Sequence, residues 1–119
     1  MKGKKLNKQE RKRLKLIKFF LKKIDKNSLK YLKKIKPQEQ LELSKYLLIS
    51  KLKLRCLEIE NEFLRKKKAK KLDLKFYYLK NKISKIPAKI KLFELNMTKE
   101  EFKKINSFLK NIEENLKNV

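Results

Sequence analysis

The sequence predicts an all-α fold of four to five helices in a small bundle around one long central helix. Three observations predict it. Among 119 residues there are only one Gly and two Pro, so turn signals are few. The abundant residues Lys, Leu, Ile and Glu favour helix or tolerate it. Apolar residues recur at steps of three, four and seven, which places them on one side of a helix.

The chain has the length of one domain, which we expect over residues 7–119 after a basic tail over 1–6. Asn7 and Glu10 have the spacing of an N-terminal capping pair, so a first helix is predicted from there to about Ile24. Its polar face is rich in lysine. A face that is merely solvated is the alternative to a binding face.

The next segment breaks the helical pattern before Pro37. Asn27 or Ser28 is the expected cap of a short helix that carries its apolar residues at Leu29, Leu32 and Ile35. Pro37 then ends this helix or occupies the first turn of the next one.

The central helix is predicted from about Gln38 to the mid-60s, and it has two apolar stripes. One stripe is Leu41, Leu48, Leu52, Ile59 and Phe63; the other is Leu43, Leu47, Leu54, Leu57 and Leu64. We expect the first to pack on the chain's own helices and the second to meet a partner subunit. Full burial of the second stripe within the chain would contradict the partner surface. Cys56 lies close to the apolar face and is expected to be a structural thiol.

The net charge of +24 is distributed in blocks. Residues 1–40 carry a net +13 and residues 65–91 a net +11, whereas 41–64 and 92–119 are neutral. The cationic blocks are predicted to bind an anionic partner, with the phosphate backbone of DNA or RNA first and a membrane surface or acidic protein next. The predicted phosphate-binding residues are Lys12, Lys15, Lys22, Arg65, Lys66, Lys67, Lys68, Lys70 and Lys71.

The run RKKKAKK over 65–71 holds most of these cations. Like charges three and four residues apart disfavour an isolated helix there, and bound phosphates would relieve the repulsion. The run also has the composition of a nuclear-localisation signal, which any basic loop would match.

A fourth helix is predicted over 72–83, opening at Asp73. Tyr77 and Tyr78 stand among its lysines, where they would stack on exposed bases or, as we prefer, pack at the margin of the core. Over 84–95 apolar residues alternate with polar ones, and an extended connector or one short helical turn is expected.

The last helix has the clearest start in the sequence. Thr98 and Glu101 form a capping box, and Met97 and Phe102 have the positions of a hydrophobic staple. Apolar residues then follow at steps of three and four up to Leu116.

Catalysis is not expected. The chain has no His, which excludes Ser-His and Cys-His pairs and imidazole ligands, and its single Gly excludes a phosphate-cradling Gly loop. The paired carboxylates that could act as acid and base, Glu58 with Glu62 and Glu100 with Glu101, are predicted on solvated faces among lysines. We expect no cofactor, metal or small-molecule substrate. There is no apolar run long enough to span a bilayer.

The two neutral blocks resemble a known family over about 50 residues. The C-terminal residues that match are Thr98, Glu100, Glu101, Phe102, Phe108, Asn111, Glu113, Leu116, Lys117, Asn118 and Val119; those of the central helix are Arg55, Ile59, Glu60 and Phe63. This pattern is similar to the Sld-type subunit of the eukaryotic GINS complex. Glu58 departs from it, since the family usually has Lys there. The basic N-terminus replaces a long acidic region, and the family's small β domain is missing.

The resemblance implies a scaffold role, because GINS joins the MCM ring and a further factor in the replicative helicase and does no chemistry of its own. The protein would then be a helical-domain-only subunit, nuclear, or cytoplasmic if prokaryotic, in a hetero-oligomer with other replication subunits. The predicted interface residues are Leu47, Leu54, Arg55, Ile59, Phe63, Phe102, Phe108 and Leu116. The alternative is a small RNA-binding, ribosomal or ribonucleoprotein component. A peripheral membrane protein that inserts Phe19 and Phe20 ranks last.

Overall fold

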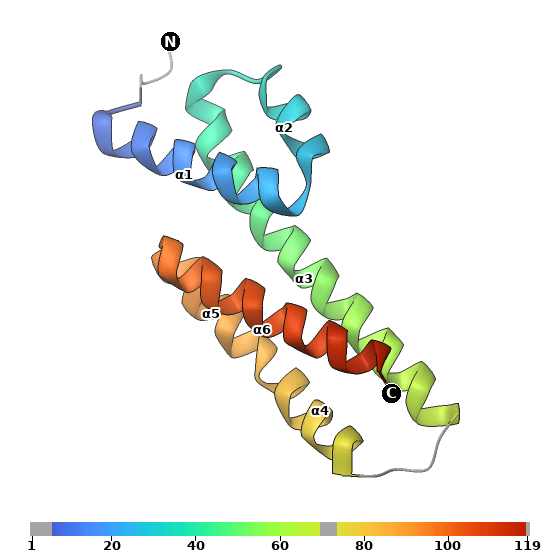
Figure 1. Cartoon of the computed structure of the whole chain (residues 1–119). Helices are drawn as coiled ribbons and strands as arrows, with labels where there is room; N and C mark the ends of the chain where they lie inside the picture. The colour runs from blue at the N-terminus through green and yellow to red at the C-terminus, as the bar shows by residue number, and fades with distance from the viewer. Residues whose placement is uncertain (1–5, 70–73, 119) are drawn as a thin grey trace. The chain divides into compact units, whose positions relative to one another are not determined.

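The computed structural model describes residues 6–69 and 74–118, without the side chains of Lys68 and Ala69. The helices of the described part are α1 Lys8–Ile24, α2 Lys26–Leu32, α3 Pro37–Ala69, α4 Leu74–Ser84, α5 Ile86–Asn96 and α6 Lys99–Lys117 (Figure 1). The described ranges contain no strand, so the all-α prediction around one long helix is confirmed.

The helices pack as two compact units, Met1–Lys51 and Leu52–Val119. The division falls inside α3. The first unit therefore consists of α1, α2 and the N-terminal part of α3, and the second consists of the rest of α3 with α4, α5 and α6.

The first unit has a small apolar core in which α1 packs beside α2. Its fully buried side chains are Ile17, Phe20, Leu21, Leu32 and Leu48. Asn7 and Glu10 form the predicted capping box of α1, with the Glu10 N–H 2.8 Å from the Asn7 side chain. Leu6, expected in the tail, is instead buried, and its carbonyl accepts a hydrogen bond from Arg11 Nε at 3.0 Å. The rest of the predicted tail lies outside the described residues.

The short second helix begins earlier than predicted because its cap is Asp25. The Asp25 carboxylate accepts the N–H of Asn27 at 3.0 Å and the hydroxyl of Ser28 at 3.1 Å. Ser28 is thus a buried donor rather than the cap. Lys51 Nζ lies 2.9 Å from the same carboxylate, which joins α3 to the start of α2. A carboxylate at this position satisfies free N–H groups and suits the positive end of the helix dipole.

Helix α3 begins with Pro37 in its first turn, where the missing proline N–H has no partner to lose. It continues to Ala69, so the first part of the basic run is helical. Two contacts offset the expected repulsion: Arg65 pairs with Glu62, and Lys66 donates to the backbone carbonyl of Leu116 on α6.

In the second unit α6 lies beside α4 and α5, and the C-terminal part of α3 packs against them (Figure 1). The rings of Phe63 on α3 and Phe76 on α4 have centroids 5.9 Å apart. Phe93 on α5 and Phe102 on α6 are separated by the same distance. All four rings are buried, so one aromatic contact connects α3 with α4 and a second connects α5 with α6.

The segment 84–95 is mostly helix α5, which corrects the expected connector. Pro87 stands in the first turn, a position that proline tolerates. Ile86, Ile90 and Phe93 are buried at steps of four and three, which is helical spacing. The alternation that suggested an extended chain arose because exposed apolar residues lie between the buried ones.

The turn from α5 to α6 is made by Met97, which has left-handed backbone angles of φ 45° and ψ 44°. Its N–H caps α5 on the Phe93 carbonyl at 2.6 Å. The side chain is buried with Phe102, as the staple prediction requires. The Thr98 hydroxyl accepts the Glu101 N–H at 3.2 Å, so the Thr98 half of the predicted capping box is confirmed. The Glu101 carboxylate lies 3.8 Å from Lys104 Nζ instead of completing the box.

Candidate nucleic-acid and protein interfaces

Helix α1 presents a continuous cationic face. Lys12, Lys15 and Lys22 are exposed, and steps of three and seven bring them to one side of the helix. Within the described part of the chain, no carboxylate forms an ion pair with any of the three. The acid of α1, Glu10, is engaged in the capping box. This face can therefore offer its positive charge to phosphates.

The apolar side of α1 is used inside the first unit. Ile17, Phe20 and Leu21 are fully buried, and only Phe19 of the predicted membrane-inserting pair is exposed. Lys23 Nζ lies 5.1 Å from the centroid of the Phe19 ring. Burial of Phe20 removes half of the apolar edge on which the membrane hypothesis depended, and we do not propose it further.

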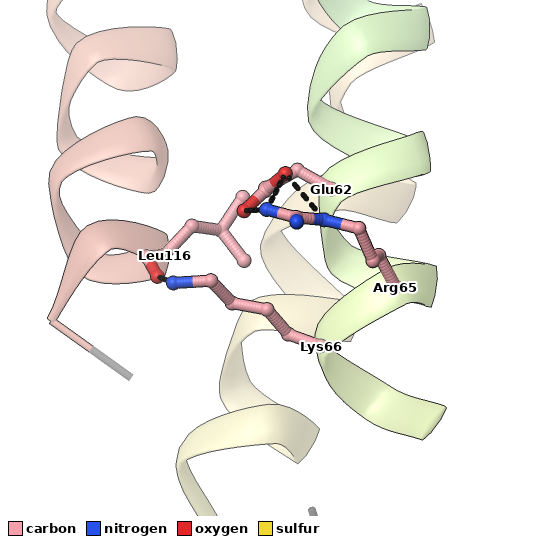
Figure 2. Close-up of polar contacts among 4 residues, drawn as sticks. All are labelled: Glu62, Arg65, Lys66 and Leu116. Carbon is pink, nitrogen blue, oxygen red and sulfur yellow. Dashed lines mark hydrogen bonds and ion pairs between the residues drawn. The ribbon is translucent and has the colours of Figure 1, made fainter. Parts of the chain in front are cut away.

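The basic run 65–71 is partly bound within the second unit. Arg65 Nη2 lies 2.6 Å from Glu62 Oε1, and its Nε lies 3.2 Å from Oε2, so the guanidinium binds the carboxylate in a bidentate ion pair (Figure 2). This hydrogen bonding lowers the pKa of Glu62. Since both groups are charged and satisfied, Arg65 is a poorer phosphate contact than the sequence suggests.

Lys66 has a structural role in addition to its charge. Figure 2 shows its ammonium group at the end of α6, where it donates to the carbonyl of Leu116. The last carbonyls of a helix lack intrahelical partners, and a cation there also suits the helix dipole. Lys67 is half-buried. The side chain of Lys68, and Lys70 and Lys71 entirely, lie outside the described residues.

The two stripes of α3 have opposite environments, as predicted. Every residue of the first stripe is at most 6% exposed. In the second stripe Leu54, Leu57 and Leu64 are 47%, 55% and 52% exposed, and Leu43 and Leu47 are half-buried. The second stripe is therefore not fully buried within the chain, and full burial is the result that would have contradicted a partner surface. Three large leucines on one side of a helix form an apolar surface that a folded monomer leaves open to solvent.

Several of the predicted interface residues belong to the core instead. Ile59, Phe63, Phe102 and Leu116 are buried within the second unit, which leaves them almost no surface for a partner. Their apolar periodicity predicted burial correctly, but it does not distinguish an internal contact from an external one. Leu54 remains exposed, and Leu47 and Phe108 are half-buried. Lys89 Nζ lies 4.6 Å from the centroid of the Phe108 ring.

Arg55, also predicted at the interface, connects α3 to α6. Its Nε donates to Glu113 Oε1 at 2.7 Å and its Nη1 donates to Asn106 Oδ1 at 2.8 Å. The two blocks that carry no net charge, 41–64 and 92–119, are thus joined by a charge-assisted pair. The guanidinium is engaged inside the unit.

A groove of about 500 Å³ lies between α3 and α5 beside the exposed stripe. Its lining residues are Lys53, Cys56, Leu57, Pro87, Ile90, Lys91 and Glu94. The sequence did not reveal this groove, because one wall is the helix that was expected to be a connector. Leu57 belongs to both the groove and the stripe, so the apolar surface continues from α3 toward α5.

Cys56 in this groove is buried, and the prediction of a structural thiol is consistent with its environment. Burial raises the pKa of the thiol to about 11, with a further contribution from the Glu60 carboxylate, whose Oε1 accepts from Sγ at 3.6 Å. A thiol held in its protonated form is a poor nucleophile.

Tyr77 and Tyr78 on α4 are 64% and 65% exposed. Their rings lie largely in solvent, which is more exposure than packing at the core margin would give.

In the part of the chain that the structure describes, no group of His, Cys, Asp or Glu residues is arranged to hold a metal ion. None of the described helices combines the length and apolar character needed to cross a membrane.

Compared with protein-family models, curated proteins and solved structures, the chain shows no match. The resemblance to the GINS subunit therefore stays a prediction that depends on the residues quoted for it.

Proposed function

We propose that this protein is a non-enzymatic subunit of a DNA-replication assembly of the GINS type, with a protein-docking surface on α3 and a phosphate-binding face on α1. The observation that carries the proposal is the open leucine stripe, Leu54, Leu57 and Leu64, on a helix whose opposite stripe is buried. A protein that only binds nucleic acid has no need of such a surface. The expected occupant is an apolar helix face of a partner subunit.

The resemblance supports this choice of assembly. Its two matched segments, in the central helix and the last helix, contact one another through Arg55 and Glu113. Both segments also belong to the same compact unit. The matching residues that the structure describes thus lie together in one folded region.

The phosphate-binding part of the proposal depends on α1. Lys12, Lys15 and Lys22 are exposed, lie on one face and are not neutralised by described carboxylates. Flexible ammonium groups contact phosphate oxygens with little regard for sequence. The expected activity is salt-dependent binding that positions the assembly on nucleic acid without reading its bases.

Affinity purification from the native cell tests the docking surface. The wild-type chain should recover other replication subunits, and the double variant Leu54→Gln, Leu57→Gln should not. The matched control is Leu92→Gln, Leu95→Gln, which alters two exposed leucines of α5 and should recover them as the wild type does. Recovery of no replication subunit by the wild type would overturn the proposed assembly.

Salt titration of DNA binding tests α1. Replacing Lys12, Lys15 and Lys22 by Gln should reduce the slope of log affinity against log salt by about 2 to 3, since each phosphate contact contributes about 0.9. The control replaces the same number of exposed lysines on α6: Lys103, Lys110 and Lys117. Equal slopes for the α1 variant and the wild type would show that this face does not bind phosphate.

A ribonucleoprotein component is the second candidate, and the exposed ring of Tyr78 among the lysines of α4 favours it. The lysine face of α1 would serve RNA as well as DNA. Cosedimentation with ribosomes through a salt wash would support this candidate. Recovery of replication subunits without ribosomes would reject it.

A further inference from the structure

A second groove in the second unit lies between α4 and the end of α6. It measures about 320 Å³, and its lining residues are Lys75, Tyr78, Leu79, Lys82, Asn115 and Asn118. The groove thus combines an aromatic ring, two ammonium groups and two amides in a space that a planar base can enter. None of the described residues that line it is acidic.

The face of α4 that borders the groove is built by helical spacing. Lys75, Tyr78 and Lys82 stand at steps of three and four, so they share one side of the helix. The Tyr78 ring is mostly exposed, whereas the next residue, Leu79, is buried and anchors α4 to the unit. The ring is therefore accessible on a helix that is itself fixed.

The α6 side of the groove is ordered by a small polar network. The side-chain carbonyl of Asn111 accepts from Lys82 Nζ at 3.0 Å and from Asn115 Nδ2 at 3.1 Å. This bond orients the Asn115 amide, and its Oδ1 accepts no hydrogen bond from the described residues. Amides that carry both a donor and an acceptor match the edges of bases.

We propose that this groove binds single-stranded nucleic acid, with one base stacked on Tyr78, its edge near Asn115 and Asn118, and a flanking phosphate at Lys75. A duplex buries its base faces, so stacking on a protein ring requires an unpaired strand or end. The lysines of the lining attract the phosphates of nucleic acid and offer no such attraction to a protein segment with few acidic residues. The inference takes nucleic acid as the ligand from the proposed function, but it depends on other residues in the other unit.

Binding of the full chain to fluorescein-labelled oligo(dT) tests the groove by anisotropy. Tyr78→Leu should weaken binding about 5- to 160-fold, the range that loss of one base–aromatic stack produces. Tyr78→Phe keeps the ring and should bind as the wild type does. The matched control is Tyr77→Leu, which removes an equally exposed neighbouring ring that does not line the groove.

Ligand variants identify the contact as stacking. An oligonucleotide with abasic sites should bind the wild type about as weakly as oligo(dT) binds Tyr78→Leu, and duplex DNA should not distinguish the two proteins. Thermal unfolding followed by circular dichroism checks that each variant is folded. If folded Tyr78→Leu and the wild type bind oligo(dT) with equal affinity, the proposal that the groove stacks a base on Tyr78 is overturned.

The outcomes separate this inference from the proposed function. Loss of the three α1 lysines should lower the salt slope for single and double strands alike, whereas Tyr78→Leu should leave the slope unchanged. If the α1 variant behaves as expected and Tyr78→Leu has no effect, only the groove is rejected. If the wild type binds neither single-stranded nor duplex nucleic acid, the groove and the phosphate-binding part of the proposed function both fail.

Discussion

The guanidinium of Arg55 reaches from α3 to the carboxylate of Glu113 on α6, with 2.7 Å between Nε and Oε1. It also donates to Asn106, which lies about two helical turns before Glu113 on α6. The side chain is mostly removed from solvent, so this pair is shielded better than an ordinary surface ion pair. We therefore expect the pair to contribute to the free energy of unfolding of the second unit.

Arg55→Met should lower the free energy of unfolding by about 1 to 2 kcal/mol, because charged hydrogen bonds are lost and Glu113 loses its partner. Arg55→Lys should recover only part of this, since an ammonium cannot reach both acceptors as a fork. Urea unfolding measures both. In a double-mutant cycle with Glu113→Met, a coupling energy near zero would show that the pair contributes nothing to stability.

The same substitution, Leu→Ala, should lower the free energy of unfolding by different amounts in the two stripes of α3. Leu52→Ala should cost about 2 to 5 kcal/mol, because Leu52 is fully buried and a cavity would remain. Leu54→Ala removes the same atoms two residues away, where the side chain is about half exposed, and should cost less than about 1 kcal/mol. Denaturant unfolding of the two variants is a matched comparison. Equal losses would mean that the second stripe is also packed.

The ion pair of Asp25 predicts a dependence of stability on pH. Hydrogen bonds from Lys51 and Ser28 lower the pKa of the Asp25 carboxyl in the folded chain. The unfolded state therefore binds this proton first. The stabilisation is present above the ordinary aspartate pKa of about 4 and is lost as the pH falls through the lower folded value.

Asp25→Asn is the variant that isolates this effect, because asparagine retains the capping oxygen and removes the charge. The difference in unfolding free energy between the wild type and this variant should shrink as the pH falls from 5 to below the folded pKa. Urea titrations at several pH values measure it. A difference that stays constant over this range would contradict a lowered pKa.

The thiol of Cys56 should react slowly. With a pKa of about 11, it has roughly a hundredfold less thiolate at pH 8 than an ordinary cysteine. Ellman's reagent should modify the folded chain at least that much more slowly than the urea-unfolded chain. Glu60→Gln removes the neighbouring negative charge, so the midpoint of the rate–pH profile should move down. It should still exceed the ordinary value, since burial is the larger cause.

The features set by local sequence were predictable. The cap of α1 at Asn7, the cap of α6 at Thr98 and the division of α3 into two stripes each depend on residues within a few positions of one another. Capping spacing and helical periodicity are local rules, so the structure confirms them without any knowledge of the neighbours.

The features set by distant contacts were not predictable. The ion pair of Asp25 with Lys51 was not predicted, because the two residues are far apart in the sequence. Helix α5 was missed because Pro87 and an apparent alternation masked its spacing. Of the candidate site, the lysines of α1 and the exposed leucines were predicted. The two grooves were not, because each has walls from two different helices.

The contact of Lys66 with the last turn of α6 puts two uses of one ammonium group in competition. A phosphate that engaged Lys66 would have to displace the carbonyl of Leu116, and the end of α6 would lose its cap. Ligand binding at this position and stability of the helix terminus are therefore opposed. Any anion would bind here more weakly than the local charge suggests, by the free energy of releasing that carbonyl.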